Sequence, residues 1–167
     1  SLLSCSFFFG GYPMIKFSTR LLAFLFTACA TTPRAPDIPL SYIEPQLQPL
    51  VDDFYRECRK VLGDQCDTRI ALSVRVDKLP DNTYGVCYLY NKPQEYVRQV
   101  DISKEILTKP SLLKVVLYHE LIHCILQQEH YDDHLDLMNT YTNEGTAQYV
   151  LLYWHFYLTT ALERARK

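Results

Sequence analysis

One apolar stretch constrains the fold of this 167-residue chain more strongly than any other feature. Residues 112–126, if helical, carry apolar side chains on almost every side, from Leu112 through Val116 to Leu126. A helix that is hydrophobic all round belongs inside a protein. We therefore expect a buried central helix, with Ser111 as its N-cap, and expect the other elements to pack around it.

Three polar side chains toward the end of this stretch form the pattern His119-Glu120-x-x-His123. Residues four apart lie on one face of a helix, so the two imidazoles stand one turn apart, with Glu120 about 100° round the axis. Burying such groups without partners costs roughly 1–3 kcal/mol each, and more for a bare charge. A zinc ion would bind both rings, and Glu120 could accept a proton from a water at the metal. The plainer alternative is a core helix with two buried histidines and no metal.

The stretch from His119 to Asn139 resembles the metzincins, a family of zinc peptidases that includes the matrixins. That family places a third histidine just beyond a His-Glu-x-x-His helix and a methionine-containing turn under the metal. The resemblance implies that His130 is the third ligand and that Met138, eight residues later as in matrixins, is the turn methionine. Residues 70–165 also resemble small uncharacterised bacterial metallopeptidases with a His-Glu-Leu-Gly-His-Cys motif and a Met-Asn turn.

The loop after the helix departs from the family pattern in two respects. His130 follows His123 by seven residues, where matrixins have six. Residues 127–128 are glutamines, and no helix-breaking glycine stands between the two histidines. Other side chains of the same loop could therefore replace His130 as the third ligand, namely Asp133 or His134.

A second zinc-peptidase pattern competes further along the chain. Residues 143–147, Asn-Glu-Gly-Thr-Ala, resemble the third-ligand segment of gluzincins, in which a glutamate from a following helix completes the site. Glu144 lies 21 residues after His123, which is a workable distance. A purely structural reading also exists, because Asn143 could cap the last helix and Glu144 would then sit favourably in its first turn. The spacing of Met138 favours His130 over Glu144.

These residues predict a zinc-dependent metallopeptidase that hydrolyses peptide bonds. Glu120 would act as general base on the water, and Tyr141 could donate a hydrogen bond to the oxyanion. A protein or peptide substrate would add as a strand along an edge of the sheet, over residues 83–90. Alternatively, the protein is a non-catalytic metal-binding lipoprotein that binds a partner through its aromatic surface. Three ligands would hold Zn²⁺ and leave a fourth position open to water, namely His119, His123 and His130.

Hydrophobic periodicity outside the central helix predicts an α+β fold in one small domain over residues 46–167. The resemblance to zinc peptidases implies that this fold is zincin-like. A sheet of three or four strands would pack on the central helix, flanked by helices over residues 46–62, ended by Gly63, and 143–164. The short connections favour an antiparallel meander, whereas a zincin sheet would be mixed. The expected strands cover residues 68–76, 83–90 and 96–102.

The N-terminal residues read as an export signal. After an upstream extension, residues 14–29 combine early positive charge, a short apolar core and small residues before Cys29. Thr27-Ala28-Cys29 resembles the lipobox of bacterial lipoproteins, so we expect a membrane anchor on a lipidated Cys29. Residues 1–29 would then precede a proline-rich tether over residues 30–45. The protein would face the periplasm or the exterior of a bacterial cell envelope, or be secreted if the signal is an ordinary one.

Charge and cysteine usage fit an exported protein. The formal net charge of −2 does not favour nucleic acid as a partner. Four cysteines follow Cys29, and in an oxidising compartment they predict two disulfides with three possible connectivities. We expect Cys58–Cys66 to close a helix onto the next segment and Cys87–Cys124 to tie a strand to the metal helix. Free thiols or thiolate zinc ligands are the alternatives, although no Cys-x-x-Cys spacing occurs.

Overall fold

The computed structural model describes residues 41–66, 71–92, 95–131 and 135–166. The predicted signal, Cys29 and most of the predicted tether lie outside these residues, as do Asp133 and His134. None of the helices in the described part of the chain is both long and apolar enough to cross a membrane.

Four α-helices and a four-stranded sheet make up the described domain, so the predicted α+β class is confirmed. Short helical turns follow the first helix and the last strand, at Gly63–Cys66 (η1) and Lys104–Ile106 (η2). The strands are β1 (Tyr42–Ile43), β2 (Ala71–Asp77), β3 (Gly85–Lys92) and β4 (Glu95–Ser103). The helices are α1 (Gln48–Leu62), α2 (Pro110–Leu121), α3 (Glu144–Leu152) and α4 (Trp154–Arg164).

The sheet is mixed, with strand order β1-β2-β4-β3, and the predicted antiparallel meander is wrong. β4 pairs with β2 in parallel and with β3 antiparallel, so β3 forms one edge. Neighbouring strands lie only about 4.8 Å apart, so the seven residues 78–84 can step from β2 across one intervening strand. β4 occupies this central place because its residues 97–103 are buried throughout.

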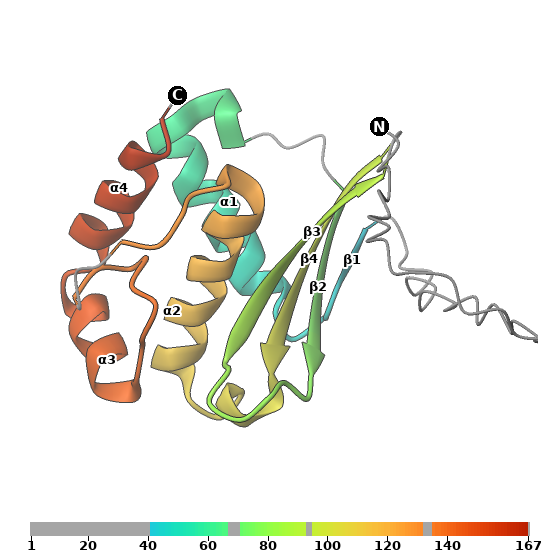
Figure 1. The fold of residues 1–167 in the computed structure, drawn as a ribbon. Helices are drawn as coiled ribbons and strands as arrows, with labels where there is room; N and C mark the ends of the chain where they lie inside the picture. Colours follow the sequence, from blue (N-terminus) through green and yellow to red (C-terminus); the bar gives the residue numbers. More distant parts are fainter. Residues whose placement is uncertain (1–40, 67–70, 93–94, 132–134, 167) are drawn as a thin grey trace, which may run out of the picture. The chain divides into compact units, whose positions relative to one another are not determined.

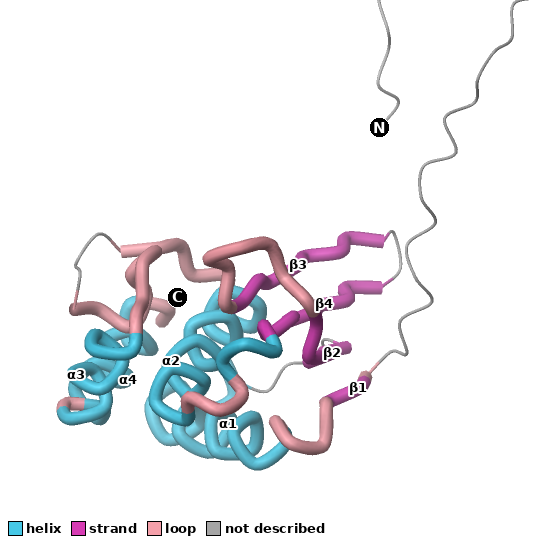
Figure 2. Tube along the Cα trace, turned by 90° about the horizontal axis from the view of Figure 1, so that it is seen from below, coloured by secondary structure: helices cyan, strands magenta, loops and turns pink. Residues whose placement is uncertain are grey.

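All four helices cover one face of the sheet (Figures 1 and 2). α2 lies next to the sheet, with α3 and α4 on its far side, and its residues from Val115 to Leu121 are all buried. Tyr118 of α2 packs edge-on against Phe54 of α1 and Trp154 of α4, with ring centroids 5.3 Å and 4.8 Å apart. The predicted central helix is therefore confirmed as the core of the domain.

Helix boundaries differ from the sequence prediction in two places. α2 begins at Pro110 after the N-cap residue Lys109, not after Ser111, because proline in the first turn needs no side-chain cap. The single helix expected over residues 143–164 is broken at Tyr153, which joins α3 to α4. In addition, Tyr42–Ile43 of the predicted tether pair with β2 as strand β1.

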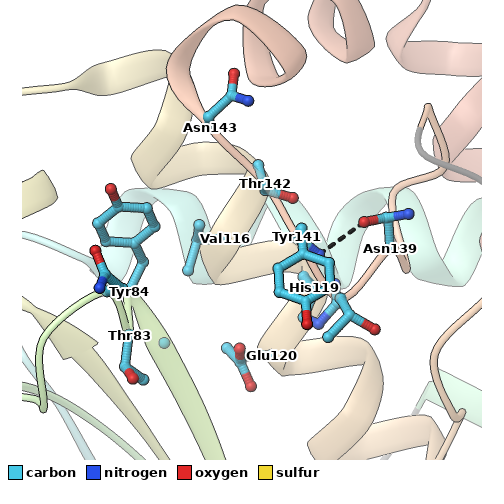
Figure 3. A pocket seen from close by; sticks show the side chains of 12 residues that line it. Thr83, Tyr84, Val116, His119, Glu120, Asn139, Tyr141, Thr142 and Asn143 are labelled. Atoms are coloured by element: carbon cyan, nitrogen blue, oxygen red, sulfur yellow. Dashed lines mark hydrogen bonds between the residues drawn. The ribbon is translucent and has the colours of Figure 1, made fainter.

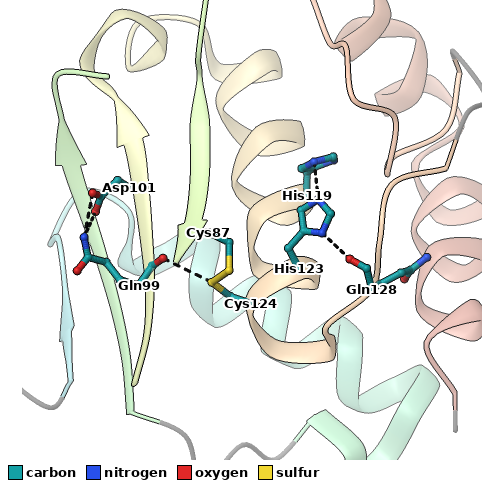
Figure 4. Close-up of a disulfide and its surroundings, with 7 residues drawn as sticks. All are labelled: Cys87, Gln99, Asp101, His119, His123, Cys124 and Gln128. Carbon is teal, nitrogen blue, oxygen red and sulfur yellow. Dashed lines mark hydrogen bonds between the residues drawn. A yellow bond between two sulfur atoms is a disulfide. The ribbon is translucent and has the colours of Figure 1, made fainter. Parts of the chain in front are cut away.

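Both predicted disulfides are present. Cys58–Cys66 closes the end of α1 onto η1. Cys87–Cys124 joins the edge strand β3 to the helical turn after α2 (Figure 4). The second bridge therefore ties the edge of the sheet to the turn that carries His123.

Candidate metal centre

Three imidazole rings converge at the end of α2. The Nε2 atom of His119 lies 2.9 Å from Nε2 of His123 and 3.2 Å from Nε2 of His130. Within the described ranges, these residues form the group of histidine, cysteine or acidic side chains whose ligand atoms could hold a metal ion. His119 is buried, His123 is partly buried and His130 is exposed, so the group opens to solvent on one side.

Backbone carbonyls fix the orientation of two of these rings. Nδ1 of His119 donates to the carbonyl oxygen of Leu137 at 2.9 Å, and Nδ1 of His123 donates to that of Gln128 (Figure 4). A carbonyl can only accept, so each ring carries its proton on Nδ1 and presents the lone pair of Nε2. Burial lowers the pKa of His119 to about 3 and also lowers that of His123, which disfavours a second proton on either ring.

The arrangement fits a metal ion better than a hydrogen bond. Two Nε2 lone pairs that face each other at 2.9 Å without a proton between them repel, and a cation removes that repulsion. Tetrahedral zinc with Zn–N bonds near 2.0–2.1 Å would place ligand nitrogens about 3.3 Å apart. The observed 2.9 Å and 3.2 Å are close to this spacing. Three histidine ligands would leave a fourth position for water or substrate.

A π-helical turn, η3 (Ile122–Leu126), and the residue after it direct the chain toward His130. A π turn takes in one more residue than an α turn, which matches the extra residue between His123 and His130 noted in the sequence. Gln127 then ends the helix in the left-handed conformation, with φ 53°. The helix therefore ends without a glycine, at the steric cost of a left-handed non-glycine residue.

The turn around Met138 makes hydrogen bonds that hold the three-histidine cluster in place. Met138 is fully buried, and its N–H donates to Oδ1 of Asp136 at 2.8 Å. The carbonyl of Met138 accepts from the N–H of Tyr131, beside His130, while the neighbouring Leu137 carbonyl holds His119. One short turn therefore positions two of the three histidines.

A partly buried ion pair anchors this turn to the last helix. Asp136 is 4 % exposed, and its Oδ2 accepts from Nη1 of Arg164 at 2.6 Å. The guanidinium of Arg164 also lies 3.8 Å from the ring centre of Tyr131. Neither charged residue was predicted from the sequence, because a pair 28 residues apart leaves no local pattern.

Glu120 lies beside the histidines and is 8 % exposed. Burial raises its pKa to about 7, and a hydrogen bond from the backbone N–H of Cys87 partly opposes this shift. Gly85 of β3 allows the approach, because a Cβ there would lie 2.6 Å from Cγ of Glu120 and 2.7 Å from Val116. A carboxylate with a pKa near 7 is suited to exchange protons with water at neutral pH.

Two adjoining pockets, of about 410 Å³ and 850 Å³, open along the edge strand β3, and all three histidines line the larger one. Both are lined by Gly85, His119, Glu120 and Thr140. The first extends toward residues 139–143 (Figure 3), and the second toward residues 127–130. The metal centre therefore lies where the two halves of one cleft meet.

The remaining predicted site residues fall in different places. Tyr141 lines the first pocket and is 84 % exposed. Glu144 is not among the grouped ligands, and it lies in the first turn of α3, behind Asn143. The side chain of Asn143 accepts from the N–H of Thr146 at 3.0 Å, as expected of a helix cap. Asp133 and His134 lie outside the described residues.

Comparisons of the chain with protein-family models, with curated proteins and with solved structures find no match. The chemistry of the site is therefore interpreted from its own geometry.

Proposed function

We propose that this protein is a zinc-dependent metallopeptidase in which three histidines hold the ion, namely His119, His123 and His130. The observation that carries the proposal is the convergence of their Nε2 atoms beside a buried carboxylate in an open cleft. Imidazole ligands also suit copper, iron and nickel, so the choice of zinc rests on the motif and its carboxylate.

Glu120 is the proposed general base. A zinc ion at the three histidines would supply Lewis-acid chemistry and lower the pKa of a water toward about 7. Glu120 would accept the proton of the attacking water and pass it to the amine that leaves. Tyr141, which borders the same pocket, is the proposed hydrogen-bond donor to the oxyanion. The substrate would add to the free edge of β3, which runs along the cleft.

Two further proposals concern the fold family and the location. We propose a metzincin-like architecture, supported by the third histidine, the buried Met138 turn and the antiparallel edge strand β3. We also propose an envelope location with a lipid anchor at Cys29. The two disulfides support an oxidising compartment, and the anchor itself rests on the sequence pattern.

The decisive test compares Glu120→Gln with the parent protein. The variant should keep one zinc per chain and lose cleavage of a casein-type substrate by at least about 10²-fold. Glu163→Gln, an exposed carboxylate on α4, is the matched control and should change neither quantity. Unchanged cleavage by Glu120→Gln would remove Glu120 from the mechanism. A parent protein that binds zinc but cleaves nothing would favour the non-catalytic metal-binding lipoprotein.

The third ligand is tested by metal content alone. His130→Ala should release zinc at concentrations where Glu144→Ala retains it, because only His130 lies with the other two rings. The opposite result would support the gluzincin-type site with Glu144.

A further inference from the structure

The smaller pocket beside the metal centre has an unusual lining. Eight of the twelve residues that line it are asparagine, threonine or tyrosine, and Glu120 is the single acidic one. The lining contains no lysine or arginine. A pocket of this kind offers many neutral hydrogen-bonding groups but no salt bridge to a charged ligand.

Several of these polar groups are available to a ligand. The side chains of Asn82, Thr83 and Thr142 make no hydrogen bond to another residue in the described part of the chain. Thr142 comes from the segment before α3, whereas Asn82 and Thr83 come from the turn before β3. Donors and acceptors therefore face the pocket from two sides.

Two aromatic rings flank the same pocket. Figure 3 shows Tyr84 on one side and Tyr141 on the other, with Val116 of α2 between them. A pyranose ring has the complementary chemistry, because its C–H groups pack on aromatic and aliphatic surfaces while its hydroxyls bond to amides and hydroxyls. The volume of about 410 Å³ also lies within the roughly 300–1,000 Å³ of small-ligand pockets.

We infer that this pocket binds a neutral monosaccharide unit carried by the substrate, so that the protein cleaves glycosylated peptides in preference to bare ones. This inference rests on the proposed peptidase function. The pocket shares His119 and Glu120 with the metal centre, so its occupant would be attached to a residue next to the bond that is cleaved. An acidic side chain would meet Glu120 there, and the pocket lining holds no lysine or arginine to offset its charge.

The test uses one serine-containing peptide in three forms: unmodified, O-linked to N-acetylglucosamine, and phosphorylated. The full-length zinc-loaded protein should cleave the glycopeptide with kcat/KM about tenfold above the unmodified peptide, and the phosphopeptide more slowly than either. Moving the glycosylated serine across the cleaved bond should abolish the preference, because the pocket lies on one side of the metal. Equal kcat/KM for the glycosylated and unmodified peptides would overturn the inference and leave the peptidase proposal intact.

Variants connect the preference to the pocket. Asn82→Gly keeps the positive φ of 64° while removing the amide, and Thr142→Val removes a hydroxyl at nearly constant shape. The double variant should lose most of the glycopeptide preference and cleave the unmodified peptide within about twofold of the parent. Thr108→Val, on an exposed residue outside the pocket, should keep the preference. A double variant that keeps it would overturn the assignment to this pocket.

Binding to the zinc-loaded Glu120→Gln protein, measured by titration calorimetry, separates this inference from the proposed function. If binding depends on the saccharide but the parent protein cleaves no peptide, the peptidase activity is refuted and saccharide binding in this pocket is supported. If the parent cleaves all three peptides and binding does not depend on the saccharide, saccharide binding in this pocket is refuted and the peptidase activity is supported.

Discussion

The two faces of α2 are packed in opposite ways. On the sheet-and-cleft face, His119 and Glu120 point toward β3 and the loop, and their polar atoms are held by backbone groups from outside the helix. On the other face, Tyr118 lies between Phe54 and Trp154 in an ordinary aromatic core. One face is complete without any ligand, whereas the other brings nitrogen lone pairs together and needs a cation. The comparison predicts that changes on the two faces affect different measurable properties.

The largest effect is expected from removing a metal ligand on the cleft face. The zinc affinity of His123→Ala should fall by more than the roughly 100-fold that loss of a residue behind a ligand costs. Peptide cleavage should be lost together with the zinc. The measurement is metal content after dialysis together with peptide hydrolysis. His155→Ala, an exposed histidine of α4, is the control. His123→Ala should stay folded because the aromatic face of α2 is untouched. Retention of zinc by this variant would contradict the assignment of His123 as a metal ligand.

Gly85→Ala should separate catalysis from metal binding on the same face. The added Cβ would lie 2.6 Å from Glu120 Cγ, so the carboxylate must move while the three histidines stay. We expect kcat to fall by about 10²-fold, a typical contribution of a positioned general base, with zinc retained. Gly145→Ala in α3 is the matched control, because its Cβ would meet only an ordinary contact at 3.4 Å. Equal activity of both variants would mean that Glu120 tolerates displacement.

A smaller effect is expected from the ion pair that supports the metal centre from α4. In Asp136, one carboxylate oxygen accepts from the Met138 N–H and the other from Arg164. The Asp136→Asn carboxamide is neutral and has a single acceptor oxygen, so it cannot keep both interactions. Because this turn holds His119 through Leu137, zinc affinity should fall by roughly 10-fold or somewhat more. A competition titration with a chelator measures the change. Asp64→Asn, at an exposed carboxylate, is the control and should leave zinc affinity unchanged. An equal loss of zinc affinity in this control would mean that the change in net charge, and not the ion pair, causes the effect.

The parts of this site that were predictable share a local origin. His119 and His123 follow from a one-turn spacing on a helix, and the burial of α2 follows from its unbroken apolar pattern. The even cysteine count predicted two disulfides, and the placement of the predicted helix and strand favoured the observed pairs among three connectivities. Helix geometry and cysteine count do not depend on tertiary packing, so they can be read from the sequence.

The parts that were missed depend on contacts between distant residues. The insertion of β4 between β2 and β3 is a tertiary choice that short connections do not reveal. The Asp136–Arg164 pair and the close approach of Gly85 to Glu120 each join elements far apart in sequence. The left-handed Gln127 lacks the glycine that would have marked it, since its conformation is imposed by the path of the chain from the π turn to His130.

The smallest effect on the metal centre should come from the aromatic face of the same helix. Burial raises the pKa of Tyr118 above its ordinary value, so its hydroxyl stays protonated and donates to Oδ2 of Asp53 at 2.8 Å. Tyr118→Phe removes this bond but keeps the ring, and Lys114 and Arg56 still neutralise Asp53. The free energy of unfolding should therefore fall by only about 1 kcal/mol.

Zinc affinity and cleavage by Tyr118→Phe should match the parent protein, although Tyr118 is the direct neighbour of His119. Chemical denaturation and metal titration measure the two quantities, with the half-exposed Tyr149→Phe as control. A tenfold loss of zinc affinity would mean that the two faces of α2 are coupled through the helix. Unchanged affinity would mean instead that the orientation of His119 is set by the Leu137 carbonyl, and the packing of Tyr118 would then act on stability alone.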